Sequence, residues 1–330
     1  MNSLTSTPTN ILQFTLERPT RGRDIVLVTL VGITGSSPRA LGAQMAVDAF
    51  GDYRGSFSGG CIEAAVVAEA VATLQSGKAR LVRFGVGSPY IDIRLPCGGG
   101  IDLLFSPRPD PQIIAAILTE LEGRRPTGIN VSLDGIGVAI VPDVATGWHS
   151  NTFSVAYLPC VRIVAMGHGD TLISTARLAH FLGADVQAFS PLRSDVSTLL
   201  ANQIDSTLLE IRTQTPTLES DPWTAFAFLF HEHEWEDTLL PWALRQAHFC
   251  ALAIGGHGSR KNRSEMLRRE GFARAVLERF ELPAGLIPAT RDPATLALSI
   301  VSQIIGEYHS SVLGGGAAHD TNRLTQSLAP

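Results

Sequence analysis

The sequence predicts an α/β protein in which a mixed α+β domain is followed by a doubly wound parallel sheet of the Rossmann type. The chain has 330 residues, of which 45% are hydrophobic. This length exceeds the roughly 250–300 residues that one core usually serves, so we expect two domains. From residue 161 onward, apolar strands alternate with helices, which is typical of a parallel sheet covered on both faces. We place the domains at residues 1–158 and 159–309 and expect a flexible tail over 310–330.

Apolar runs bounded by turn residues predict the strands of the first domain. These strands cover residues 25–34, 43–48, 53–57, 78–84, 101–105 and 153–158, with a hairpin formed by 129–133 and 136–141. The hairpin turns at Asp134-Gly135, a dipeptide that favours tight turns. Apolar residues at helical spacing predict a helix over 62–74 that ends at Gly77. A second helix is expected over 111–122, because proline suits its first turn.

The second domain shows the alternation on which the fold class depends. Its expected strands are 161–166, 186–189, 225–230 and 250–254, and its expected helices are 171–182, 196–201, 239–247, 259–269 and 293–309. Parallel strands joined by helical crossovers bind ligands beyond the carboxyl ends of the strands. We therefore expect functional residues of this domain at the residues that directly follow a strand.

Composition excludes several classes of function. A formal charge of −5 argues against general nucleic-acid binding. No apolar run approaches the roughly 18 residues of a membrane span, and residues 1–12 lack the basic-then-apolar layout of a signal peptide. The four cysteines are widely spaced, unlike those of a disulfide scaffold, and are Cys61, Cys97, Cys160 and Cys250. We expect a cytoplasmic protein with reduced thiols.

Cys61 follows Gly59-Gly60 directly before the first predicted helix. Glycines let the backbone turn sharply, and the unpaired amides and dipole of a helix N-terminus favour a thiolate. Such a thiolate is a soft metal ligand, a sulfur acceptor or a nucleophile. The alternative interpretation is that Cys61 is a small residue that fills a tight turn.

A second cysteine, Cys97, precedes Gly98-Gly99-Gly100, where backbone amides can again converge on a ligand. Arg39 ends the turn Gly35-Ser36-Ser37-Pro38-Arg39 in the same domain and could bind an anion. These two segments and the Cys61 turn are the candidate ligand-binding elements of the first domain.

In the second domain, Gly167-His168-Gly169 follows a strand and opens a helix, the context of a dinucleotide fingerprint. Leu172 stands where the third glycine would be, and Ser190 stands where an acidic residue would bind the ribose. Asp170 also adds negative charge near the expected pyrophosphate. We therefore expect the Rossmann-type fold to be kept and NAD(P) to be an unlikely cofactor.

Two further patterns in this domain leave alternatives open. His231 and His233, interleaved with carboxylates after a strand, could hold a divalent metal or could belong to a solvated loop. Gly258-Ser259-Arg260 opens a basic helix after a glycine loop and favours an anionic partner such as phosphate. A merely solvated basic helix face explains the same residues.

Together these stretches resemble the XdhC/CoxI family, accessory factors that mature molybdenum hydroxylases such as xanthine and carbon monoxide dehydrogenases. The likeness covers roughly residues 25–308. In the first domain it depends on Gly35-Ser36-Ser37-Pro38-Arg39, Gly42, Gly59-Gly60-Cys61-Ile62-Glu63 and Cys97-Gly98-Gly99. In the second it depends on Gly167, Gly169, His231, His233, Gly258-Ser259-Arg260, Gly285-Leu286 and Ala297-Leu298-Ser299-Ile300. The departures at Asp170, Leu172 and Ser190 all lie in the second domain.

The resemblance implies a maturation factor rather than an enzyme. It implies binding of the molybdenum cofactor, protection while its terminal sulfur is installed, and insertion into the target. The implied partners are a molybdenum hydroxylase apoenzyme and a cysteine desulfurase, and a homodimer is a further expectation. The residues implied in cofactor binding are Cys61, Cys97, Gly59, Gly60, Gly98, Gly99, Arg39, Gly167, Gly169, Ser259 and Arg260, with both cysteines as candidate molybdenum ligands. An NAD(P)-dependent oxidoreductase and a metal-binding protein centred on His231 and His233 remain the alternatives.

Overall fold

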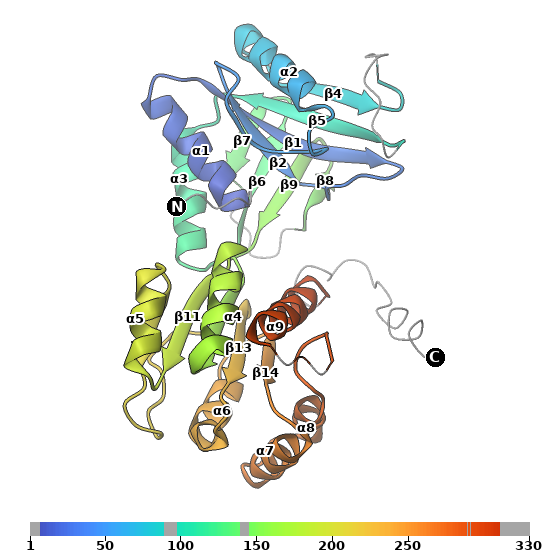
Figure 1. Cartoon of the computed structure of the whole chain (residues 1–330). Helices are drawn as coiled ribbons and strands as arrows, with labels where there is room; N and C mark the ends of the chain where they lie inside the picture. The colour runs from blue at the N-terminus through green and yellow to red at the C-terminus, as the bar shows by residue number, and fades with distance from the viewer. Residues whose placement is uncertain (1–6, 89–97, 139–144, 289, 291, 311–330) are drawn as a thin grey trace. The chain divides into compact units, whose positions relative to one another are not determined.

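The chain folds into two compact units, one spanning Thr5–Pro159 and the other beginning at Cys160 (Figure 1). The computed structural model describes residues 7–88, 98–138, 145–288, 290 and 292–310. Almost all of the expected tail over 310–330 therefore lies outside the described residues, as does Cys97. The predicted fold class is confirmed, because a mixed α+β unit precedes a unit with a parallel sheet.

The first unit contains two antiparallel sheets. The five-stranded sheet has the order β3-β2-β1-β5-β4, with β1 (Ile25–Thr34), β2 (Gln44–Asp48), β3 (Tyr53–Gly55), β4 (Arg80–Gly85) and β5 (Gly100–Pro107). The four-stranded sheet has the order β7-β6-β9-β8, with β6 (Thr127–Ser132), β7 (Gly135–Val138), β8 (Gly147–His149) and β9 (Thr152–Tyr157). The expected hairpin is confirmed, since Ser132 pairs with Gly135 across the Asp134-Gly135 turn.

The central strand β1 is buried on both faces. Ile25 and Leu27 pack in a core that contains residues of α1 (Pro8–Thr20), α3 (Pro111–Glu122) and the four-stranded sheet. Val26 and Val28 point to the opposite core, which contains the apolar face of α2 (Glu63–Ser76). Alternate side chains of one strand thus reach two cores, as the period of a strand requires.

The pairing of β1 brings separate loops together at one end of the sheet. β1 and β5 are antiparallel, and Thr34 lies opposite Gly100. The segment that follows β1 therefore lies beside the glycines that precede β5. The register shifts between Leu30 and Gly32, and a Cβ at Gly32 would come within 2.4 Å of the Asp102 carboxylate. A side chain at this bulge would therefore displace the Asp102 carboxylate.

The second unit contains a parallel five-stranded sheet in the order β12-β11-β10-β13-β14 (Figure 1). Its strands are β10 (Arg162–Gly167), β11 (Asp185–Ser190), β12 (Asp205–Leu208), β13 (Thr224–Leu229) and β14 (Cys250–Ala253). Its helices are α4 (Gly169–Phe181), α5 (Arg193–Ala201), α6 (Glu236–Leu244), α7 (His257–Arg269), α8 (Arg274–Glu281) and α9 (Pro293–Tyr308). Residues of α4, α5 and α9 share one core, and residues of α6, α7 and α8 share the other. Helices thus cover both faces, and the strand order reverses between β10 and β13.

The structure also contains elements that the sequence patterns did not predict. They are α1, β8, β12, α8 and the single turn η1 (His233–Trp235). In α1 the buried Ile11, Leu12 and Phe14 form an apolar face, but the helix begins and ends near prolines and polar residues hide its period. β12 is a four-residue edge strand rich in polar side chains. No helix within the described ranges combines the length and apolarity needed to cross a membrane.

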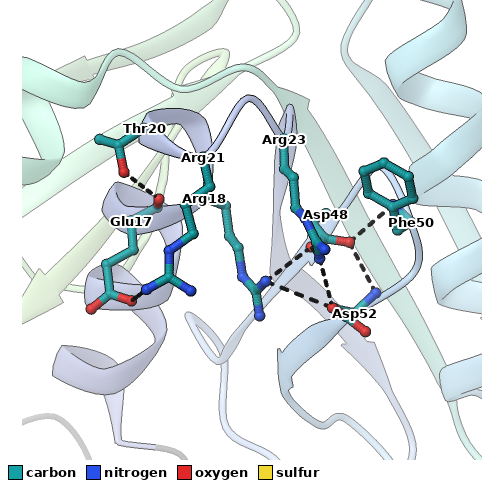
Figure 2. A network of polar contacts seen from close by, with 8 residues as sticks. All are labelled: Glu17, Arg18, Thr20, Arg21, Arg23, Asp48, Phe50 and Asp52. Atoms are coloured by element: carbon teal, nitrogen blue, oxygen red, sulfur yellow. Dashed lines mark hydrogen bonds and ion pairs between the residues drawn. The ribbon is translucent and has the colours of Figure 1, made fainter.

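A buried carboxylate connects α1 to the turn between β2 and β3 (Figure 2). Asp48 has 0% of its surface exposed. Its Oδ1 accepts from the amides of Phe50 and Asp52 at 2.9 and 3.0 Å. Its Oδ2 lies 3.1 Å from Nη1 of Arg23 and 3.5 Å from Nη1 of Arg18. Asp48 thus satisfies two turn amides and two guanidinium groups at once.

Replacement of Asp48 by alanine leaves the amides of Phe50 and Asp52 without this acceptor, whereas Arg23 and Arg18 keep only the exposed carboxylate of Asp52. We expect Asp48→Ala to lower the free energy of unfolding of the first unit by about 2–4 kcal/mol. Hydrogen–deuterium exchange at the amides of β2 reports this change. Asp52→Ala is the matched control, because its side chain is 59% exposed, and should cost less than about 1 kcal/mol. Equal effects of the two substitutions would contradict this role of Asp48.

Candidate functional site

Cys61 lies in the turn directly before α2, two residues ahead of Glu63, as predicted. Gly59 and Gly60 adopt φ values of 77° and 125°, which side chains disfavour. The thiol of Cys61 is exposed. Its side chain therefore does not fill the interior of the turn. At the other end of α2, Gly77 is a left-handed C-cap with φ of 68°, again as predicted.

The carboxylate of Glu63 organises this turn. Glu63 is 4% exposed. Its Oε1 accepts from Ser56 Oγ at 2.7 Å and from the amides of Phe57 and Ser58 at 3.0 and 2.9 Å. Its Oε2 accepts from Ser58 Oγ at 2.6 Å and from the amides of Gly60 and Ile62 at 2.8 and 3.2 Å. A single internal side chain thus binds most of the amides of the turn.

The amides of Gly59 and Gly60 are bound within the turn itself. We expected the amides around Cys61 to face its sulfur or a bound anion. The amide of Gly60 instead donates to Glu63, and the amide of Gly59 donates to Ser56 Oγ at 3.0 Å. The turn is therefore a preformed support for Cys61 rather than an open anion cradle.

The hydrogen bonds to Glu63 also determine its charge. Burial by itself raises the pKa of this carboxyl, but the hydrogen bonds from the hydroxyl and amide of Ser58 and from Ser56 outweigh burial. The pKa falls to about 2. Glu63 is therefore ionised at neutral pH, and its charge strengthens every hydrogen bond that it accepts.

The second candidate segment, Gly35-Ser36-Ser37-Pro38-Arg39, contacts the Cys61 turn through its arginine. Nε of Arg39 donates to the carbonyl of Ser56 at 3.0 Å. The hydroxyl of Ser37 accepts from the amide of Arg39 at 3.2 Å and donates to its carbonyl at 2.9 Å. Arg39 is otherwise exposed. The structure therefore places a guanidinium group beside the residues that hold Cys61.

The third candidate segment approaches the same loop from β5. A Cβ at Gly99 would lie 2.2 Å from the carbonyl oxygen of Ser36, so only glycine fits there. Gly98 has φ of 68°. The end of the Cys97-Gly98-Gly99 segment thus packs against the loop that carries Arg39. Cys97 lies outside the described residues, and a pocket shared by both sulfurs remains a prediction.

A cavity of about 170 Å³ adjoins Arg39 and Ser56. Gln44 and Tyr157 also line this cavity. The hydroxyl of Tyr157 donates to Oε1 of Gln44 at 2.6 Å, and Nε2 of Gln44 donates to Thr29 Oγ1 at 3.2 Å. Burial raises the pKa of Tyr157, so its phenol is neutral. The polar part of the lining is thus one cation and neutral groups, and the rest is apolar, with Pro8, Ile11, Ala43, Val155 and Ala156.

In the second unit, the glycine turn after β10 is closed by an internal carboxylate. Oδ2 of Asp195 accepts from the amide of Gly169 at 2.8 Å and from Ser190 Oγ at 2.9 Å. Leu172 is fully buried in the core. The Gly169 amide, which would face the pyrophosphate in a dinucleotide site, is therefore already bound to Asp195. Asp195 also adds a second negative charge to that of Asp170 near this position. Sequence reasoning missed Asp195, although an acidic residue in the first turn of α5 was a possible signal.

Of the two histidines after β13, the structure describes the side chain of His231 alone. His231 is exposed, and its ring centroid lies 5.8 Å from that of His168. The side chain of His233 is outside the described part. No group of three or more histidine, cysteine, aspartate or glutamate residues in the described ranges is arranged to hold a metal ion. Ser259 and Arg260 lie in the first turn of α7.

Comparison with known proteins agrees with this architecture. The sequence model of the XdhC and CoxI family matches residues 20–85, and that of the XdhC Rossmann domain matches residues 163–304. The molybdenum cofactor insertion chaperone PaoD of Escherichia coli is 35% identical over 302 residues, which cover 91% of this chain and 89% of PaoD. The chain belongs to the XdhC and CoxI family. The predicted resemblance is confirmed.

A crystal structure described as a xanthine dehydrogenase from Bacillus halodurans has the same fold. Its TM-score is 0.72 at 19% sequence identity, and the match covers 93% of this chain and 98% of that one. Both units of this XdhC and CoxI family member are therefore represented in a solved structure.

The charge of Glu63 makes the stability of its turn depend on pH. Its pKa lies near 2 in the folded protein against an ordinary value of 4.5. The ionised carboxylate therefore stabilises the fold fully above pH 4.5, and this contribution is lost as the pH falls toward 2. We expect a loss of about 2 kcal/mol over this range. Hydrogen exchange at the amides of Ser58 and Gly60 measures this loss of stability. Glu63→Gln is the control, because it has no carboxylate to protonate at this position. An identical pH dependence in both proteins would contradict the assignment.

Proposed function

We propose that this chain is a molybdenum-cofactor insertion chaperone that binds the cofactor through its first unit. The observation that carries this proposal is the exposed thiol of Cys61 on a turn held by Glu63, with Arg39 bound to the same turn. PaoD, which carries the name of such a chaperone, is 35% identical to this chain over nearly its whole length.

The chemistry of the cofactor fits these residues. A molybdopterin is an anionic phosphate ester with a soft metal–sulfur centre. Thiolates are the protein ligands that suit such a centre, so Cys61 would hold the molybdenum side of the cargo. Since the amides of Gly59 and Gly60 are already used within the turn, the phosphate would be bound by Arg39, whose guanidinium suits an oxyanion. Cys97 would add a second sulfur from the neighbouring segment.

The recipient would be a molybdenum enzyme, specifically a hydroxylase of the xanthine or carbon monoxide dehydrogenase type. A cysteine desulfurase would supply the terminal sulfur while the chaperone protects the cofactor. The similarity to PaoD supports a molybdenum enzyme as the recipient, and the desulfurase is carried over from the family resemblance. The competing NAD(P)-dependent oxidoreductase is disfavoured, because Asp195 binds the amide of Gly169 at the glycine turn.

Retention of the cofactor tests the role of Cys61. We expect Cys61→Ala to lower the amount of molybdenum cofactor retained after desalting at least tenfold, because a metal–thiolate bond is lost. Cys160→Ala is the matched control, since Cys160 is also exposed but lies in the second unit. The measurement is molybdenum by elemental analysis together with the fluorescence of the released pterin. Equal retention by both variants would show that Cys61 does not bind the cofactor.

Arg39 gives a separate test of the phosphate side. We expect Arg39→Gln to weaken cofactor binding about tenfold through the loss of a charge-assisted hydrogen bond. Arg54→Gln is the matched control, because Arg54 is an exposed arginine on β3 that does not line the cavity beside Arg39. Calorimetric titration with isolated molybdopterin measures both affinities. If the two variants bind equally well, Arg39 does not contact the phosphate.

A further inference from the structure

A cavity of about 680 Å³ lies in the second unit, beyond the carboxyl ends of β13 and β14. Three loop segments, together with Leu296 of α9, form its wall. The loop segments are Phe230 and His231 after β13, the turn with Gly255, Gly256, Ser259 and Arg260 after β14, and the loop that contains Pro283, Gly285, Leu286 and Ile287. A cavity of this size suits a small organic ligand. It lies at the edge of the sheet where doubly wound folds bind ligands.

The polar side of this cavity is cationic. Nη1 of Arg260 donates to the carbonyl of Gly255 at 3.1 Å, which fixes the guanidinium over the turn. Nε of Arg260 is shielded from solvent and has no hydrogen-bond partner in the described part of the chain. The hydroxyl of Ser259 is a second donor on the wall. A guanidinium with a free, desolvated donor favours an oxyanion.

The two glycine turns of this unit differ in what occupies them. After β10, the amide of Gly169 donates to the Asp195 carboxylate. After β14, α7 begins at His257 with no side-chain cap and no acidic residue in its first turn. The amides of a helix N-terminus carry partial positive charge and attract anions when no side chain satisfies them. The turn after β14 is therefore the one that is open to an anion.

The loop that contains Leu286 and Ile287 gives the cavity an apolar part of its wall. The amide of Ile287 donates to Ser299 Oγ at 2.7 Å. The amide of Gly285 donates to Oε1 of Gln303 at 2.6 Å. Gly285 has φ of 91°, which favours glycine, and a Cβ there would lie 2.3 Å from Ser299 Oγ. The apolar wall is thus tied to a helix of the core.

We propose that this cavity binds a small phosphate ester with a flat or apolar body, such as a nucleotide. Its phosphate is bound by Arg260, Ser259 and the first amides of α7. Its body lies against Leu286 and Ile287. This inference goes beyond the proposed function, since it concerns the second unit alone and does not depend on cofactor binding by Cys61.

Calorimetric titration of the full-length protein with ADP and with inorganic pyrophosphate tests this proposal. We expect both probes to bind, and ADP to bind more tightly because its base and ribose contact the apolar wall. Arg260→Gln should weaken both probes at least tenfold. Ile287→Ala should weaken ADP several-fold and leave pyrophosphate unchanged. Arg268→Gln, on the same helix but outside the cavity wall, should change neither affinity.

Three outcomes would overturn the proposal. The first is the absence of binding of both probes at millimolar concentration to the wild-type protein. The second is equal affinity of Arg260→Gln and Arg268→Gln, with both variants folded by circular dichroism. The third is tighter ADP binding in Asp195→Asn with no loss in Arg260→Gln, which would place the phosphate at the turn after β10. Retention of molybdenum cofactor by Cys61 is measured separately and is unaffected by any of these results.

Discussion

The candidate site depends on one interaction, the capture of the amides of the Cys61 turn by the carboxylate of Glu63. A turn with two glycines in left-handed conformations has a high conformational entropy when unfolded, and its buried amides need acceptors. Glu63 provides both oxygens as acceptors, and its low pKa of about 2 shows that the hydrogen bonds outweigh the cost of its burial. The result is a cysteine presented to solvent on a turn whose shape is determined before any ligand arrives. Such preorganisation lowers the entropic cost of binding.

A carboxylate also accepts hydrogen bonds from turn amides in the second unit and in the turn beside α1. Asp195 accepts from Gly169, and Asp48 accepts from Phe50 and Asp52. In each case an internal carboxylate satisfies backbone amides that an external anion could otherwise bind. Glycine turns in this protein are therefore mainly structural. Positive charge that a ligand can reach lies on arginine side chains at the rims of cavities, on Arg39 in the first unit and on Arg260 beside the uncapped turn after β14 in the second.

The Rossmann-type unit keeps its architecture although its glycine turn after β10 differs from that of a dinucleotide site. The parallel strands and helices depend on apolar residues such as Leu172, which is fully buried. A leucine at this position fills the contact between α4 and the sheet and stabilises the fold without a third glycine. The carboxylate of Asp195 then occupies the space next to the first turn of α4. The unit thus shows how a fold can persist while the ligand chemistry of one of its turns changes.

Hydrophobic periodicity and turn residues determined most elements by themselves. The helix over 111–122 has the predicted bounds, and α2 begins after Cys61 and ends at Gly77 as expected. These signals are local, because they depend on residues within a few positions of one another. The tertiary structure alone decided that Gly169 meets Asp195, that Gly99 packs on Ser36, and that α1 covers the sheet. Those partners are distant along the chain, and a hydrogen bond between distant residues leaves no period in the sequence by which it could be predicted.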